Sequence, residues 1–156
     1  MDFSNFFSYP TGDGSSSGRG DLVFLGDLAD EDWDLLLSLT QVSRFRAGEV
    51  VVQKGEAQRT LYIVGTGTLE VVVPRGMGVQ RIATIDEGSV FGEQAFFDGH
   101  PRSATVRAVT DCELMALHYE AFDTLAAKEP RLAQIVLMDL GRILSLRLRD
   151  TAPATR

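Results

Sequence analysis

The chain has 156 residues, about the size of one domain, and 44% of them are hydrophobic against 24% charged, which is typical of globular proteins. Its formal net charge is −7, from 22 acidic and 15 basic residues, and this argues against nucleic-acid binding because phosphate backbones are held by clustered Lys and Arg. The single cysteine excludes an intramolecular disulfide framework and a cysteine-based zinc cluster. Apolar runs are far shorter than the ~18 residues of a membrane span, and no secretory signal is visible, so we expect a cytoplasmic protein.

Residues 1–20 differ in composition from the rest of the chain. Four aromatic residues, Phe3, Phe6, Phe7 and Tyr9, precede a Gly/Ser-rich stretch of flexible-linker composition. Two interpretations stay open: a terminus that is disordered or folded back on the domain, or a short motif in residues 1–10 that docks on a partner protein. We therefore divide the chain into a flexible segment at 1–20 and a domain at 27–150.

A helix is predicted at the start of this domain. The apolar residues Leu28, Trp33 and Leu36 recur at helical spacing. Asp27 or Asp30 is the predicted N-cap.

The middle of the chain, from Val42 to His118, is typical of short strands. The predicted strands are rich in β-branched residues and separated by glycines. They run at 50–52, 61–64, 69–73, 79–85, 103–109 and 112–118. A hairpin is predicted at 74–78. Short strands at close spacing favour a sandwich, a jelly roll or a small barrel.

Helices return after Tyr119. A short one is predicted at 121–128, and Pro130 is well placed to open the next. The segment 131–150 is apolar nearly all round, which predicts that another part of the protein buries it. Gly141 interrupts it and marks a bend or a close approach of another element.

One stretch, residues 91–108, departs from the strand pattern. Gly92 allows a tight turn and a close backbone approach. Residues 93–97 can form one helical turn whose first N–H groups lack internal acceptors, and such a terminus binds anions. Arg102 heads the next strand and would clamp a phosphate with two hydrogen bonds. These residue types together predict an anion site.

This stretch resembles the phosphate-binding cassette of the cyclic nucleotide-binding domain family. The family pattern, Phe-Gly-Glu and then Pro-Arg-Ser/Ala/Thr-Ala-Thr/Ser-Val, stands here at 91–93 and 101–106. The resemblance continues through the turns at 46–50 and 53–56 and covers 27–149. It implies an α+β fold: an antiparallel jelly-roll-like β barrel with an N-terminal helix and two C-terminal helices.

The resemblance also implies roles for single residues. Arg102 would pair with the equatorial phosphate oxygens of a 3′,5′-cyclic nucleotide, and Glu93 would accept a hydrogen bond from the ribose 2′-hydroxyl. The phosphate cradle would be completed by backbone N–H groups of Gly92, Ala95 and either Ser103 or Ala104. The alternative is a Glu93–Arg102 ion pair that closes an empty loop, although this leaves Gly92 unexplained.

Three further positions bear on specificity. Ser103 favours cyclic AMP over cyclic GMP by resemblance, without excluding cyclic GMP. Gln94 departs from the aliphatic residue of many members and would adjust the pocket wall. Arg147, on the final helix, would either cap the purine by a cation–π contact or stand as a solvated charge.

The sequence therefore predicts a non-catalytic sensor rather than an enzyme, since no nucleophile-elbow, zinc-protease or Walker motif occurs. Binding would move the C-terminal helix, through Phe96 or Phe97 against Phe122 and a hinge at 119–130. We expect no cofactor and no metal, no DNA partner, and a readout through an unidentified protein or a homodimer formed by the C-terminal helix. Two rivals stay open: a binder of another nucleotide messenger such as cyclic di-GMP, and an interaction module without ligand.

Overall fold

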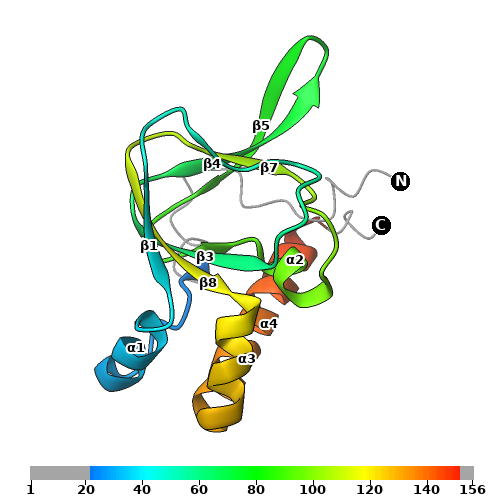
Figure 1. Ribbon diagram of the computed structural model, residues 1–156. Coiled ribbons are helices and arrows are strands. Elements are labelled where there is room, and N and C mark those ends of the chain that lie inside the picture. Colours follow the sequence, from blue (N-terminus) through cyan, green and yellow to red (C-terminus); the bar gives the residue numbers. More distant parts are fainter. Residues whose placement is uncertain (1–21, 152–156) are drawn as a thin grey trace.

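The computed structural model describes residues 22–151, and the aromatic segment at 1–20 lies outside them. Within this range the strands form two four-stranded antiparallel sheets (Figure 1). In spatial order the first sheet contains β1 (Gln41–Phe45), β8 (Cys112–His118), β3 (Thr60–Thr66) and β6 (Val90–Phe91). The second contains β2 (Val50–Val52), β7 (Thr105–Ala108), β4 (Leu69–Arg75) and β5 (Gly78–Ile85).

The two sheets form a jelly-roll-like sandwich, and in the described chain they do not close into a barrel. The predicted barrel is therefore wrong in this one respect, whereas the jelly-roll-like class is confirmed. The edge strands are β1 and β6 in the first sheet and β2 and β5 in the second, and among the described residues no edge of one sheet pairs with an edge of the other. β6 ends because the backbone at Gly92 turns into the left-handed region, with φ of 84°, and leads into a helix.

The central strand β3 of the first sheet is buried on both faces. In β3, Tyr62 and Val64 pack between the sheets, while Leu61 and Ile63 pack against the helices. β3 is thus an apolar run without alternation, as expected for a strand covered on both sides. The six predicted strand segments are all present, and the prediction did not resolve β1 and β6 as separate strands.

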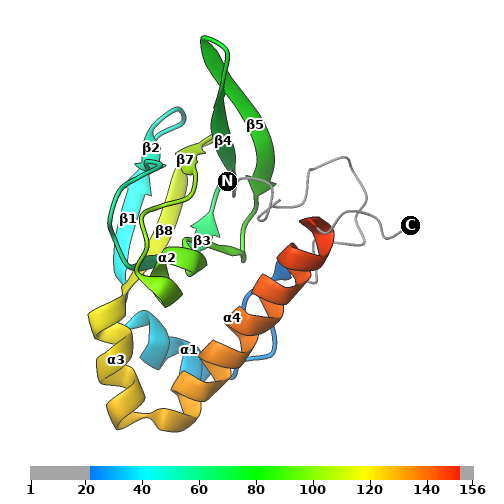
Figure 2. The same cartoon turned by 90° about the vertical axis from the view of Figure 1, so that its right-hand side faces the viewer.

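The helices are α1 (Asp30–Leu37), α2 (Glu93–Asp98), α3 (Tyr119–Lys128) and α4 (Pro130–Thr151). Figure 2 shows α4 running alongside the sandwich, with α3 leading into it. The predicted cap of α1 is wrong: its N-cap is Ala29, and no side chain caps it. Among the described helices, α4 included, none has the length and apolarity needed to cross a bilayer.

Helix α4 is buried along one face only. Leu132, Val136 and Leu140 lie in the core, as the predicted burial requires, but Met138 is 70% and Leu148 51% exposed, so the burial is confined to one face. Nothing lies within 4 Å of a Cβ built on Gly141, so the close approach predicted there is also absent.

The chain ahead of α1 also belongs to the fold. Leu22, Phe24 and Leu25 are buried in the core beneath the helices, ahead of the predicted boundary at residue 27. The backbone N–H of Leu25 donates to the Asp139 carboxylate at 2.7 Å, which joins this segment to α4.

Candidate functional site

The site is built where β6 meets α2. Gly92 is the N-cap of α2 and has φ of 84°. A Cβ at this position would lie 2.6 Å from Nη1 of Arg102 and 2.7 Å from the carbonyl oxygen of Thr60. Only glycine therefore allows both the turn and the close approach of the arginine.

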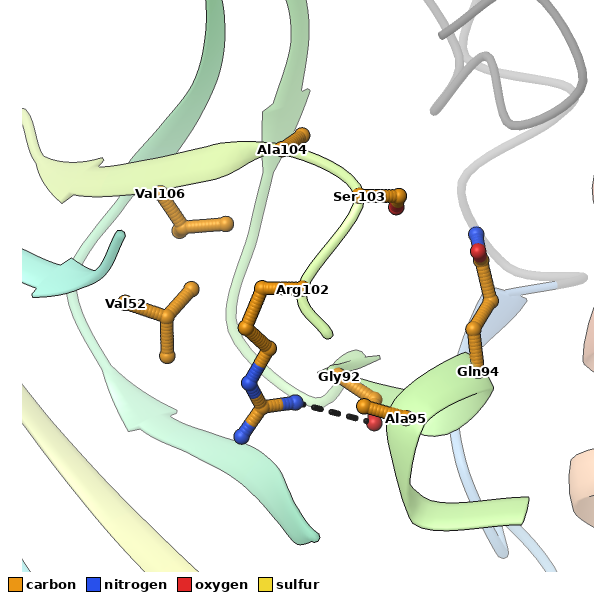
Figure 3. Close-up of a pocket in the computed structure, with 8 residues that line it drawn as sticks. All are labelled: Val52, Gly92, Gln94, Ala95, Arg102, Ser103, Ala104 and Val106. Carbon is orange, nitrogen blue, oxygen red and sulfur yellow. Dashed lines mark hydrogen bonds between the residues drawn. The ribbon is translucent and has the colours of Figure 1, made fainter. Parts of the chain in front are cut away.

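Arg102 lies against this turn and is 5% exposed. Its Nη1 donates to the carbonyl oxygen of Gly92 at 3.2 Å, and its Nη2 donates to that of Thr60 at 2.8 Å. Figure 3 shows the side chain pointing from the turn before β7 toward the start of α2. The guanidinium thus stands beside the first residues of a helix, at the place where the sequence predicts an anion.

The ring of Tyr62 lies near the Arg102 guanidinium. Its ring centroid lies 6.0 Å from Cζ of Arg102, and its ring stacks on Phe91 at a centroid distance of 5.0 Å. Burial raises the pKa of Tyr62, and the Arg102 charge opposes this shift. The phenol is therefore neutral at physiological pH.

A small cavity opens at this point (Figure 3). Its volume is about 30 Å³, enough for water but not for a nucleotide. It is lined by Val52, Gly92, Gln94, Ala95, Arg102, Ser103, Ala104 and Val106. The structure therefore brings together five of the predicted ligand-binding residues around one small, partly open cavity.

The other two predicted residues, Glu93 and Arg147, form a buried ion pair outside the cavity lining. Nη1 of Arg147 donates to Oε1 of Glu93 at 2.7 Å, and the two side chains are 1% and 0% exposed. Nη2 of Arg147 also donates to the carbonyl oxygen of Val90 at 2.6 Å and to Oγ of Ser89 at 3.2 Å. Arg147 is thus no solvated charge, and the cation that pairs with Glu93 here comes from α4.

Apolar contacts connect the site to the hinge. The rings of Phe96 and Phe122 meet edge to face at 5.5 Å, as the sequence predicts for the first of its two candidates, while Phe97 is 38% exposed. Phe96 also meets Tyr119, the first residue of α3, at 5.8 Å. The end of α2 therefore packs on the start of α3.

Sequence reasoning did not single out Arg59, Thr60 and Ser89 as parts of the site. Thr60 supplies a carbonyl to Arg102, and its hydroxyl lies 2.8 Å from Nδ1 of His118. Arg59 donates to the carbonyl oxygens of Phe96 and Phe97 at the end of α2. Three of the acceptors are backbone carbonyls at strand and helix ends, for which side-chain patterns give no signal. In the described chain no group of His, Cys, Asp or Glu could hold a metal ion.

Comparison with known proteins agrees with this geometry. The model of the cyclic nucleotide-binding domain family matches residues 42–129, and this chain belongs to that family. It is 33% identical over 133 residues to the cyclic AMP receptor protein of Thermus thermophilus, an alignment that spans 85% of this chain and 59% of that protein. The alignment therefore spans 59% of the length of that relative.

Two solved structures share the fold. A cyclic nucleotide-binding domain from Methylobacillus flagellatus superposes with a TM-score of 0.75 at 26% identity, covering 86% of this chain and 80% of that one. The cyclic di-GMP-responsive regulator CLP of Xanthomonas campestris superposes with a TM-score of 0.70 at 25% identity, covering 79% of this chain and 61% of that one. The fold is therefore shared by proteins described with different nucleotide ligands.

Proposed function

We propose that this domain is a non-catalytic sensor that binds a 3′,5′-cyclic nucleotide, with cyclic AMP favoured over cyclic GMP. The observation that carries the proposal is the buried Arg102 guanidinium held against the left-handed turn at Gly92. Its Nη1 and Nη2 donate to neutral carbonyls, and an anionic phosphate is a stronger acceptor than either. A cyclic phosphate would therefore take over the donors that now hold the Thr60 and Gly92 carbonyls.

The remaining residues would complete the site. Backbone N–H groups of Gly92, Ala95 and either Ser103 or Ala104, all at the cavity, would bind the phosphate oxygens. Glu93 would accept a hydrogen bond from the ribose 2′-hydroxyl, because an ionised carboxylate only accepts and beside a phosphate needs a donor from the ligand. This contact would select ribose over deoxyribose.

The preference for cyclic AMP rests on Ser103 and on the family resemblance alone. Other nucleotides must therefore be tested beside cyclic AMP. Cyclic di-GMP is the second candidate, favoured by the likeness to the Xanthomonas regulator. The cavity of about 30 Å³ is partly open and smaller than the ~300 Å³ of ordinary ligand sites, so we expect a nucleotide to extend beyond it into the adjoining open space.

The output would pass through α3 and α4. Phe96 against Phe122 supplies the contact that turns a shift of α2 into a shift of the hinge. The exposed Met138 and Leu148 on α4 suit either a partner protein or a second copy of this chain. We expect no binding to DNA, because the net charge is −7. We also expect no cofactor and a cytoplasmic location.

Titration calorimetry with cyclic AMP, cyclic GMP, cyclic di-GMP and 5′-AMP tests the proposal. Arg102→Ala removes two charge-assisted hydrogen bonds at about 1.5–3 kcal/mol each, so the affinity should fall by roughly 10²–10⁴. Arg46→Ala, which removes an exposed arginine, is the matched control. If Arg102→Ala changes the affinity by less than fivefold, Arg102 does not clamp the phosphate. If the wild type binds none of the four nucleotides, the result favours an interaction module without ligand.

A further inference from the structure

An open groove lies between the chain ahead of α1 and the first half of α4. Its volume is about 1320 Å³, far more than that of the cavity at the cassette. One wall comes from residues 23–29 and the first turn of α1, and the other from residues 131–142 of α4. The wall on α4 is about 17 Å long at 1.5 Å per residue. The groove is therefore long enough to hold several residues of an extended chain.

The two walls of this groove are linked at both ends. At one end, Nη2 of Arg142 on α4 donates to the carbonyl oxygen of Val23 at 2.9 Å. At the other end, Nη2 of Arg131 on α4 donates to the carboxylate of Asp32 on α1 at 2.9 Å. The groove is thus part of the fold rather than a gap that its side chains could close.

Between these links the groove presents apolar side chains. Leu28, Ile135 and Met138 line it, and Met138 is 70% exposed. The Arg131 side chain at its end is 69% exposed. A thioether and a guanidinium both make favourable contacts with aromatic rings. The chemistry of the groove therefore suits aromatic side chains.

The chain itself carries such side chains within reach of the groove. Four aromatic residues occur among residues 3–9, which we call the aromatic segment. Residues 10–21 join it to Leu22 and Val23, and Val23 already lines the groove. A Gly/Ser-rich chain of this length has a root-mean-square end-to-end distance of about 20 Å. This distance matches the length of the groove.

Attachment to the same chain favours this segment over an untethered occupant. A short linker of flexible composition gives an effective concentration in the millimolar range. With a dissociation constant of about 0.1 mM for the untethered segment, about nine-tenths of the molecules would then hold it bound. Contacts of a few aromatic rings are therefore sufficient.

We propose that the aromatic segment docks into this groove of its own chain and covers Met138 on α4. A partner protein that binds the same face of α4 has to displace the segment, so the segment limits access to this helix. The docking does not depend on nucleotide binding. Only the limit on access to α4 rests on the proposed function, and the tests below use no nucleotide.

Limited digestion of the full-length chain with chymotrypsin tests the docking, because this protease cleaves after accessible aromatic residues. Met138→Asp places a charge in the groove, and Met77→Asp is the matched control at a fully exposed methionine in the turn between β4 and β5. Mass spectrometry should show cleavage within residues 3–9 about 3- to 10-fold faster in Met138→Asp than in the wild type. Met77→Asp should match the wild type. Equal rates in all three proteins overturn the proposal.

The same digestion at low and high protein concentration shows whose groove holds the segment. Protection by docking within one chain should not change on dilution. Protection that disappears on dilution would mean that a second copy supplies the groove, and this outcome also overturns the proposal.

A second variant leaves every described residue unchanged, so it cannot disturb the described fold directly. Phe6→Ser together with Phe7→Ser removes two of the four aromatic rings and keeps the chain length. In full-length protein with ¹³C-labelled methionine methyl groups, the Met138 resonance should move, because the ring currents of the docked segment are lost. The Met77 resonance should stay in place. An unchanged Met138 resonance overturns the proposal, even if Met138→Asp does not fold.

Discussion

Gly92 shows how one residue type fixes the geometry of the site. Its φ of 84° is shared with Gly48, at 90°, but the surroundings differ. A Cβ at Gly92 would meet Arg102 and Thr60 below 3 Å, whereas nothing lies within 4 Å of a Cβ at Gly48. The two positions therefore separate backbone strain from steric exclusion.

Gly92→Ala should weaken cyclic nucleotide binding by more than tenfold, because the new methyl group displaces the Arg102 guanidinium. Gly48→Ala carries the same left-handed strain, about 1–2 kcal/mol, and should leave the affinity within twofold. Calorimetry on both variants measures the difference. Equal losses in the two variants would mean that strain alone is responsible.

The proposed role of Glu93 can be tested with two ligands that differ only in the ribose 2′-hydroxyl. Glu93→Gln should reduce the ratio of cyclic AMP affinity to 2′-deoxy cyclic AMP affinity toward one, because the variant loses the anionic acceptor for the 2′-hydroxyl. Loss of the Arg147–Glu93 ion pair in this variant affects both ligands alike and cancels in the ratio. An unchanged ratio would remove Glu93 from the ribose subsite.

At the scale of elements, Arg59 connects the cassette helix to the hinge. It donates to the carbonyl oxygens of Phe96 and Phe97, its Cζ lies 3.6 Å from the ring centroid of Tyr119, and its own carbonyl accepts from the N–H of Tyr119. The last carbonyls of α2 and the first residue of α3 are thus held by one arginine.

Arg59→Ala should lower the melting temperature by a few degrees, because three hydrogen bonds to helix-end carbonyls and a cation–π contact are lost. Arg59→Lys should have a melting temperature between those of the wild type and Arg59→Ala, since lysine keeps the positive charge but lacks the planar guanidinium. Thermal unfolding followed by circular dichroism, with Arg46→Ala as control, measures this. A melting temperature equal to that of the control would show that the contact is not stabilising.

Elements with a strong periodic pattern could be predicted from the sequence, and elements defined by tertiary contacts could not. The strands β2, β3, β4, β5, β7 and β8 carry β-branched residues, and Pro130 marks the start of α4. β6 has only two residues, so its existence depends on pairing with β3. The exposed face of α4 was missed because its leucines and methionine are apolar whether or not another element covers them.

The residues of the site also fall into two groups: those that a local motif predicts, and those that only tertiary packing brings together. Gly92, Arg102 and Ser103 follow a local motif, and the structure brings them to one cavity. The Arg147–Glu93 pair joins positions 54 residues apart, and no local pattern indicates which cation meets Glu93. The physical reason is that the pairing is set by how α4 lies on the sandwich, which only the packing of the apolar core determines.

At the scale of the whole molecule, two cores share one sheet. β3 and β8 contribute residues both to the core between the sheets and to the core beneath the helices. The cassette turn at Gly92 contacts Thr60 at the start of β3, and His118 at the end of β8 leads directly into α3. The site and the hinge therefore contact the same pair of strands, so a change at the site is close to the residues that lead into α3 and α4.

The central claim is that occupation of the cassette moves α4. The distance between spin labels at Val42→Cys on β1 and Ser145→Cys on α4 tests it most directly, since both positions are exposed. Native Cys112 is buried, and burial raises the pKa of its thiol, so it competes poorly for the label. Saturating cyclic AMP should shift the distance distribution measured by double electron–electron resonance, and the same labels with Arg102→Ala should show no shift. An unchanged distribution in a protein that calorimetry shows to be fully bound would contradict the account.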